Sequence, residues 1–479
     1  MNSDRLLGVT VLPEYLQSEG IEPVLDNLAR HGINAVTTSP YVMEPADEAT
    51  GAREPPIDAG AGSVRLLDRP LWGRRELWVR TAPSFDPNRA LYRGLKYQPP
   101  EPIALTHQQG ETIDRFIAAA HARQMRVYFQ VQAAIPPGYR VQFGGPDQSD
   151  VPRLPNGERP ARRVANNGSL ASPDIVAYQD ALIRDLCGRY PEIDGLRFDW
   201  PEYPPYFLDD VFVDFSDHAR RAAAELGFDF DRMQRDAAGA YQRLHGGLSN
   251  DALRRLCEPG GGRFVLLVWL ADFPGLLDLM RFKAALSERL LTGFRQSMDD
   301  AGAARMELMP NAFPPPWSFA SGMDFRRAAA ISSGIAVKLY GMHWAMMLRF
   351  YGDQLAAANP GLDESLLVAS LTKTLDILDE SGPESLNEWR YPEPDEPHPA
   401  GHLAQIRKIT QAQTRAGATP IYTLAHGYGP VDDFRRRFAT ALSAGPHGVW
   451  INRYGYLSDE KLTAIGELAE SAEPAAFLT

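Results

Sequence analysis

An arginine and an aspartate stand two residues apart in a short apolar run, and this pair is the first feature of the sequence that could do chemistry. The run reads Leu196-Arg197-Phe198-Asp199. Successive side chains of a β-strand point to opposite faces, so Arg197 and Asp199 would share one face. Charged side chains in a buried strand are costly unless they serve a ligand, a reaction or an ion pair. We interpret Asp199 as a candidate catalytic carboxylate that Arg197 keeps ionised, with a purely structural ion pair as the alternative.

A second carboxylate is needed if Asp199 takes part in glycoside hydrolysis, because that reaction uses two carboxyl groups flanking the bond that breaks. Glu307 lies in the apolar run Arg305–Met309, and the alternation of that run turns it to the inner face that also holds Asp199. Glu202 follows Asp199 by three residues and is the second choice. The separation of the two groups decides the stereochemical outcome, about 5–5.5 Å for retention and wider for inversion.

Eight short apolar runs, each followed by a helical pattern, would position these residues. The expected strands are 6–11, 35–39, 126–132, 193–199, 305–309, 335–340, 420–424 and 448–452. The helix expected at 174–190 begins after Ser172-Pro173, a typical helix start. Eight strand–helix units close a (β/α)8 barrel, which is the predicted fold. An open doubly wound sheet is the alternative, but no G-x-G-x-x-G turn follows the first strand.

Three long segments interrupt this alternation and are interpreted as insertions after strands two, three and four of one barrel domain, 1–479. Residues 40–110 are rich in Pro and Gly, and a turn is expected at Trp72-Gly73. Residues 133–173 are irregular, and residues 207–262 have a polar helical pattern. The run Phe264–Leu270 fits a strand or a buried helix, because periodicity cannot separate the two in so short a run.

Polar residues recur on the inner face of the expected strands and just beyond their ends. A filled barrel interior is normally built from branched apolar side chains. This lining therefore predicts a polar ligand, and a buried network that only stabilises the barrel is the alternative. The candidate binding residues are Glu14, Gln130, Arg197, Trp200, Asn311, Lys338, Tyr340, His343, His426 and Asn452.

The composition argues against several classes of function. The formal net charge is −12, which disfavours a general nucleic-acid binder but not a carbohydrate ligand. Two cysteines are too few for a disulfide framework, and no zinc, calcium or other metal motif is present, so no metal or cofactor is expected. The polar first residues are not followed by a long apolar run, so we expect a cytoplasmic protein without a membrane partner. The oligomeric state stays open.

The stretch Asp194-Gly195-Leu196-Arg197-Phe198-Asp199 resembles the strand-four motif of the α-amylase clan, in which an Arg and a nucleophilic Asp are separated by one residue. Continued through Trp200 and Pro204, it is more similar to bacterial glycoside-hydrolase-like barrel families. Segments 166–172, 281–283, 306–316 and 338–340 resemble further parts of those families. The resemblance implies a barrel that cleaves glycosidic bonds of an oligo- or polysaccharide. The clan's Gly-Glu and His-Asp pairs are absent, because Met306 precedes Glu307 and Gly427 follows His426.

Three functions follow from these observations. The leading hypothesis is a glycoside hydrolase-like enzyme with a two-carboxylate mechanism. The inner position of Lys338 keeps a Schiff-base aldolase or lyase open as a different enzyme class. A carbohydrate-binding barrel without catalysis is the third. The sequence does not distinguish the sugar, the linkage or the stereochemical outcome.

Overall fold

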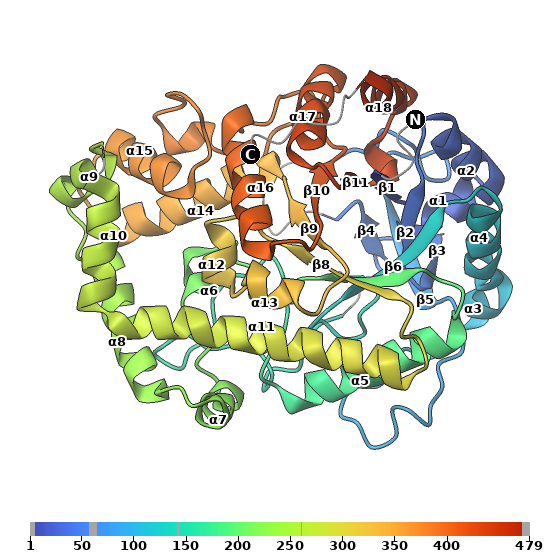
Figure 1. Cartoon of the computed structure of the whole chain (residues 1–479), viewed down its shortest axis with the longest axis horizontal. Coiled ribbons are helices and arrows are strands. Elements are labelled where there is room, and N and C mark those ends of the chain that lie inside the picture. Colours follow the sequence, from blue (N-terminus) through green and yellow to red (C-terminus); the bar gives the residue numbers. More distant parts are fainter. Residues whose placement is uncertain (1–4, 57–64, 141–143, 260, 472–479) are drawn as a thin grey trace.

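Eight parallel strands close into a barrel, with helices around it (Figure 1). The computed structural model describes residues 5–56, 65–140, 144–259 and 261–471. The strand order is β1-β11-β10-β9-β8-β7-β6-β2, and each neighbouring pair is parallel. The strands are β1 Leu6–Thr10, β2 Ala35–Thr38, β6 Arg126–Gln132, β7 Gly195–Asp199, β8 Glu307–Ala312, β9 Ile335–Lys338, β10 Ile421–His426 and β11 Gly448–Asn452. The predicted (β/α)8 barrel is confirmed.

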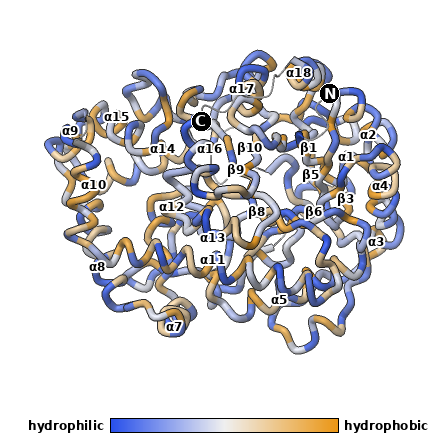
Figure 2. The backbone as a smooth tube through the Cα atoms, viewed as in Figure 1, coloured by the Kyte–Doolittle hydropathy of each residue, from blue (hydrophilic) through white to orange (hydrophobic). Residues whose placement is uncertain are grey.

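The helices around the barrel cover the apolar outer face of the strands. They are α2 Ile21–Arg30, α4 Glu111–Ala122, α5 Pro173–Arg189, α11 Pro274–Asp300, α13 Phe325–Ala329, α14 Gly341–Ala358, α16 His402–Ala416, α17 Val431–Ala444 and α18 Asp459–Ser471, with the shorter α1 Pro13–Ser18, α12 Trp317–Ser321 and the peripheral α15 Glu364–Leu375. Hydrophobic and hydrophilic stretches alternate along α5 and α11 (Figure 2). Phe198 of β7 stacks on Phe294 of α11 at 4.4 Å between ring centroids. The apolar side chains of β7 therefore face the helices, as predicted.

Local sequence signals explain where these helices begin. Ser172 accepts a hydrogen bond from the Ile175 backbone N–H at 3.3 Å, and Pro173 occupies the first helical position of α5. Proline is well suited to that position because its missing N–H would have had no partner inside the helix. Ser172 and Pro173, which predicted the start of this helix, therefore also determine where α5 begins.

The segment after β2 differs from the loop that the sequence predicted. It contains a three-stranded antiparallel sheet of β3 Tyr41–Ala46, β4 Ala52–Glu54 and β5 Leu77–Pro83, in the order β3-β5-β4. A helix, α3 Ala104–Gln109, follows. Leu71 and Arg74 exchange two backbone hydrogen bonds of 2.9 Å, which is the turn expected at Trp72-Gly73.

In the part of the chain that the structure describes, five helices follow β7 before α11 returns to the barrel. They are α6 Leu208–Val211, α7 Asp217–Leu226, α8 Phe230–Leu244, α9 Asn250–Cys257 and α10 Gly261–Asp272. The run Phe264–Leu270 belongs to α10, so its ambiguity is resolved in favour of a helix. Among the residues the structure describes, no helix combines the length and apolar character needed to cross a bilayer.

Aromatic rings fill the middle of the barrel. Trp450 of β11 meets Tyr128 of β6 edge to face, with ring centroids 5.3 Å apart. Gly8 of β1 makes room for this packing, because a Cβ atom there would lie 2.2 Å from the Trp450 ring.

Candidate active site

An ion pair between Asp199 and Lys338 lies at the carboxyl ends of two barrel strands. Asp199 ends β7 and Lys338 ends β9, and the Lys338 Nζ atom is 2.6 Å from Asp199 Oδ1. The Lys338 side chain is 4% exposed and that of Asp199 is 15% exposed. Asp199 therefore remains open to a ligand while Lys338 supports it from within the barrel. The active sites of this fold lie at this same end.

Arg197 sits beneath this pair and bonds to an amide rather than to a carboxylate. Its Nη2 donates to Asn311 Oδ1 at 2.9 Å, and its guanidinium carbon lies 4.0 Å from the Trp450 ring centroid. Asn311 Nδ2 in turn donates to Gln130 Oε1 at 3.4 Å. Burial lowers the pKa of Arg197 to about 10, an effect that the nearby Tyr340 and Asp199 oppose. Three predicted binding residues thus form one connected layer below Asp199.

Aromatic and imidazole rings surround the ion pair. The Tyr340 ring meets His426 at 5.0 Å and His343 at 5.4 Å between centroids. Burial, followed by the charge of Asp199, raises the pKa of the Tyr340 hydroxyl, and Arg197 and Asn452 oppose the rise. The Trp200 ring centroid lies 5.1 Å from Lys338 Nζ. The structure therefore gathers these predicted residues around Asp199.

His426 is a buried ring whose Nδ1 atom already has a partner in its own chain. Its Nδ1 atom accepts a hydrogen bond from the Tyr428 backbone N–H at 3.1 Å. The side chain is buried, and this burial holds the pKa of His426 well below its usual range. His426 is thus a neutral ring packed against Tyr340 and Tyr456. Tyr206, which the sequence did not single out, contacts His343 at 3.3 Å between hydroxyl and Nδ1.

Several buried polar atoms at this end of the barrel have no hydrogen-bond partner among the described residues. Thr10, Thr38 and Gln132 are the last residues of β1, β2 and β6. Buried polar groups are nearly always paired in folded proteins, so a concentration of unpaired ones indicates a place built for a polar ligand. The atoms are Thr10 Oγ1, Thr37 Oγ1, Thr38 Oγ1, Gln132 Oε1, Arg197 Nε and Nη1, Trp200 Nε1, Trp450 Nε1 and Tyr456 Oη.

Glu202 is a buried carboxyl group close to the ion pair. Its Oε1 accepts from the Phe313 backbone N–H at 2.8 Å, and its Oε2 accepts from the Ser321 hydroxyl. Burial raises the pKa of Glu202 to about 7; Lys338 opposes that rise, and Asp199 adds to it. Through these hydrogen bonds, Glu202 connects the residues that follow β8, up to the end of α12, with the loop that follows β7.

The structure does not bring Glu307 to Asp199. Glu307 is the first residue of β8 and pairs with Gly195, whereas Asp199 pairs with Asn311 four residues further along. At about 3.3 Å per residue this offset is about 13 Å, too far for two carboxyl groups that flank one glycosidic bond. Glu307 accepts from Tyr128 Oη at 2.8 Å and pairs with Arg126 at 3.2 Å, at the opposite end of the barrel. The predicted pairing of these two carboxylates is wrong.

Glu14 belongs to a buried charge network that the sequence did not reveal. Arg140 lies 3.0 Å from Glu14 and 2.5 Å from Glu54, and Arg453 lies 2.6 Å from Glu54. Burial raises the pKa of Glu14 while Arg140 opposes the rise. The network joins the inserted sheet to α1 and to the residue after β11. No local pattern could have predicted it, because Glu54 and Arg453 are distant in the chain and meet only in the closed barrel.

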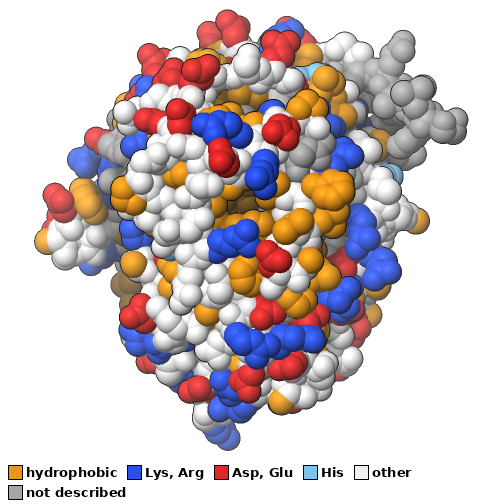
Figure 3. All heavy atoms as spheres, turned by 90° about the vertical axis from the view of Figure 1, so that its left-hand side faces the viewer, with side chains coloured by type: hydrophobic (Ala, Val, Ile, Leu, Met, Phe, Trp, Pro, Cys, Tyr) orange, Lys and Arg blue, Asp and Glu red, His pale blue; other side chains and the backbone are white. Residues whose placement is uncertain are grey.

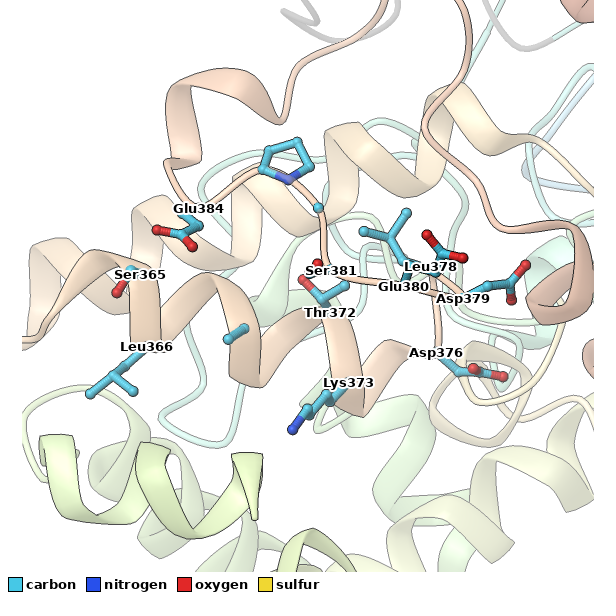
Figure 4. A pocket seen from close by; sticks show the side chains of 13 residues that line it. Ser365, Leu366, Thr372, Lys373, Asp376, Leu378, Asp379, Glu380, Ser381 and Glu384 are labelled. Carbon is cyan, nitrogen blue, oxygen red and sulfur yellow. The ribbon is translucent and has the colours of Figure 1, made fainter. Parts of the chain in front are cut away.

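A surface cavity of about 600 Å³ lies between α15 and the segment 376–384, away from the barrel strands (Figure 4). Two of its acidic side chains, Asp376 and Asp379, already have protein partners. Asp376 pairs with Arg407 at 2.6 Å, and Asp379 accepts from the backbone N–H groups of Leu403 and Ala404 at 2.7 Å each. These two carboxylates bind groups of α16 and are not free for a substrate. We therefore place the candidate site at the carboxyl end of the barrel. Among the described residues no group of three potential metal ligands comes together.

Comparison with known proteins gives a likeness of fold. No family model and no curated protein matches the sequence. A β-galactosidase from the psychrophilic Marinomonas ef1 superposes with a TM-score of 0.50 at 11% identity, covering 97% of this chain and 59% of that one. A β-galactosidase from the Antarctic haloarchaeon Halorubrum lacusprofundi gives 0.46 at 12% identity, covering 99% and 59%. The catalytic domain of the β-amylase from Paenibacillus polymyxa gives 0.48 at 10% identity, covering 98% and 99%.

The two β-galactosidases are longer than this chain, which spans 59% of each. The chain is thus a (β/α)8 barrel whose fold is similar to that of the Marinomonas β-galactosidase, at 11% sequence identity.

Proposed function

We propose that the protein is a glycoside hydrolase-like enzyme that cleaves an oligo- or polysaccharide at the carboxyl end of the barrel. The observation that carries the proposal is the gathering of polar groups around the Asp199–Lys338 pair, several of them buried without a partner in the described part of the chain. Sugars offer many hydroxyl groups that donate and accept, and the surrounding rings offer faces on which a pyranose can pack.

Asp199 is the candidate nucleophile or base. Its carboxylate lies 2.6 Å from Lys338 Nζ, and the Arg197 guanidinium lies beneath the pair, where it donates to Asn311. Glu202 becomes the candidate general acid, because a pKa of about 7 keeps its proton available near neutral pH. Release of the Ser321 hydroxyl would be needed before Glu202 could reach a glycosidic oxygen, since that hydroxyl holds Oε2.

The test is a screen of aryl glycosides and oligosaccharides with the wild type, Asp199→Asn and the matched control Glu307→Gln. Loss of the nucleophile should lower kcat/KM by at least about 10³-fold. Glu307→Gln should stay within about threefold, because Glu307 lies at the other end of the barrel. Wild-type rates in Asp199→Asn would remove Asp199 from the reaction. Saccharide binding without turnover in the wild type would instead favour a binding barrel.

Lys338 keeps the aldolase alternative testable. Its Nζ lies 4.9 Å from the Phe313 ring centroid and touches Asp199. A Schiff base requires an amine that is free to attack a carbonyl carbon, whereas Lys338 Nζ lies against Asp199, so this geometry supports the hydrolase better. Borohydride trapping of a carbonyl substrate on Lys338 would reverse that preference.

A further inference from the structure

A second cavity lies at the carboxyl end of the barrel and is lined by none of the residues that surround Asp199 and Lys338. It is formed by segments that follow three neighbouring strands, β2, β1 and β11, and such segments lie at this end of a (β/α)8 barrel. Its volume is about 490 Å³, which is ordinary for a ligand pocket. The residues that line it include Ser18, Glu19, Asp68, Arg69, Trp72 and Asp459.

Trp72 lies in this cavity on a turn whose backbone does not suit it. Leu71 and Arg74 exchange two backbone hydrogen bonds of 2.9 Å, so Trp72 and Gly73 form a two-residue hairpin turn. Their φ angles are +46° and +78°, and a turn with two positive values prefers Asn-Gly or Gly-Gly. Bulky side chains rarely adopt this conformation, and strained residues are concentrated at binding and active sites. The chain thus has an indole where asparagine would fit the backbone better.

The cavity combines this ring with hydrogen-bonding groups that still have capacity. The Trp72 ring is half-buried and packs in part against the hydrophobic core, which holds it in place. Ser18 Oγ is buried and has no hydrogen-bond partner among the described residues. Glu19 accepts from Tyr454 Oη through Oε1, and Asp459 accepts from Arg69 through Oδ1. Within the described ranges no hydrogen bond reaches the second oxygen of either carboxylate.

The charged groups of the cavity are balanced, which disfavours a charged ligand. Arg69 pairs with Asp459, and its Nη1 atom lies 3.6 Å from Glu19 Oε1. Lys461 Nζ lies 2.6 Å from Asp68 Oδ2. A cation would approach Arg69, and an anion would approach three carboxylates, so both would meet like charge. Basic and acidic side chains are also interspersed on the face of the molecule that Figure 3 shows. A neutral ligand with many hydroxyl groups and an apolar ring face fits such a cavity.

We infer that this cavity is a second saccharide-binding site, which holds a neutral oligo- or polysaccharide against the Trp72 ring. Sugar hydroxyls can donate to the carboxylates of Glu19 and Asp459 and can bond to the Ser18 hydroxyl. The inference rests on the proposed function for its class of ligand. A polysaccharide held at two places on one protein is bound more tightly than at either place alone, because the second contact forms within the complex.

Native electrophoresis of the full-length protein in gels that contain a soluble polysaccharide tests this site. The neutral probes are soluble starch, galactan, xylan and glycol chitin, and polygalacturonate is the acidic probe. At least one neutral polymer should retard the wild type. Trp72→Asn should raise the dissociation constant about tenfold or more, because it removes the ring while giving the turn its preferred Asn-Gly pair. Trp269→Asn, at a half-buried tryptophan of α10 outside the cavity, is the matched control and should be retarded like the wild type.

Asp459→Ala is a second variant, and its side chain is 87% exposed, so the change does not threaten folding. It should raise the dissociation constant about threefold. Thermal unfolding shows whether each variant folds, and Asp459→Ala decides the matter if Trp72→Asn does not.

Three results would overturn the inference: no retardation by any neutral polymer, retardation by polygalacturonate alone, or a folded Trp72→Asn that is retarded like the wild type. Retardation that depends on Trp72 in a protein without glycosidase activity would support this site and contradict the proposed function. Glycosidase activity with retardation that does not depend on Trp72 would do the reverse.

Discussion

Glu202 is the residue whose environment has the clearest thermodynamic consequence. In the unfolded chain its carboxyl titrates near its ordinary value of 4.5, whereas the folded protein holds the proton up to about pH 7. Between these values the unfolded state binds fewer protons, so the free energy of unfolding falls as the pH rises. The group destabilises the folded protein above pH 7 relative to a side chain that does not titrate.

Glu202→Gln should therefore gain stability relative to the wild type between pH 4.5 and pH 7, by a total of about 3 kcal/mol. Glutamine keeps an oxygen for the Phe313 N–H and removes the titration. Urea unfolding of both proteins at a series of pH values measures the difference. A difference that does not change with pH would show that Glu202 titrates normally.

Asp199 and Lys338 should depend on each other for stability. Removing one partner of a buried ion pair leaves the other charge uncompensated, so Lys338→Met should lower the free energy of unfolding by about 3 kcal/mol. In Asp199→Asn/Lys338→Met both charges are gone, and the double change should cost about 2 kcal/mol less than the sum of the single changes. Chemical unfolding of the four proteins gives this coupling energy, and additive effects would contradict the 2.6 Å contact.

From the sequence we predicted correctly which face of a strand a side chain occupies. The position of a side chain along the barrel axis was predicted less well. The alternation placed Arg197, Asp199 and Lys338 on the inner face, where they lie. It also turned Glu307 inward, yet the strand begins at Glu307 and runs to Ala312 instead of covering Arg305–Met309. Because of that shift, Glu307 lies at the amino end of β8 and not near its carboxyl end. Alternation has a period of two residues and carries no information about register.

At the scale of elements, the packing of β1 against β11 depends on Gly8. A Cβ atom at this position would overlap the Trp450 ring, which the barrel interior holds in place. Gly8→Ala should therefore lower the free energy of unfolding by about 2–3 kcal/mol through overpacking.

Gly293 of α11 is the matched control, because a Cβ atom there meets no described residue within 4 Å. Gly293→Ala should raise stability by about 0.5–1 kcal/mol, since alanine is the better helix former. Thermal unfolding of both variants makes the comparison. Equal effects of the two changes would argue against the tight contact in the barrel.

Strands whose apolar runs end at clear stop signals were predicted closely. The bounds of β6 and β11 agree with the predicted ones. The alternation of apolar and polar side chains begins at Arg126 in β6 and directly after Gly448 in β11. The sheet of β3, β4 and β5 was missed, because its strands include Pro45 and Pro83 and pair across a long excursion. α10 was ambiguous because a helix with apolar residues on every side has no periodicity to detect.

At the scale of the whole molecule, the buried network around Arg140 should make the inserted sheet and the barrel unfold together. Arg140 contacts Glu14 of α1 and Glu54 of β4, and Arg453 contacts Glu54 from the end of β11. Arg140→Met leaves two buried carboxylates without their shared cation and should cost about 3–5 kcal/mol.

Hydrogen exchange followed by mass spectrometry measures this coupling. In the wild type the peptides of β5 and of β1 should exchange with similar opening free energies, as expected for one cooperative unit. In Arg140→Met the β5 peptides should exchange earlier than those of the barrel strands. Protection of β5 that is unchanged in the variant would show that other contacts hold the sheet.

The pairing of β1 with β11 has a consequence for biosynthesis. Leu6 pairs with Gly448, and the other side of β1 pairs with β2. At about 5–20 residues per second a ribosome takes about 20–90 s to reach Gly448 after releasing Leu6. Throughout that interval the first strand has an open edge, a known template for wrong pairing between nascent chains. Chaperones that shield exposed strand edges during translation should therefore raise the yield of this protein more than they raise that of a chain whose neighbouring strands are consecutive in sequence.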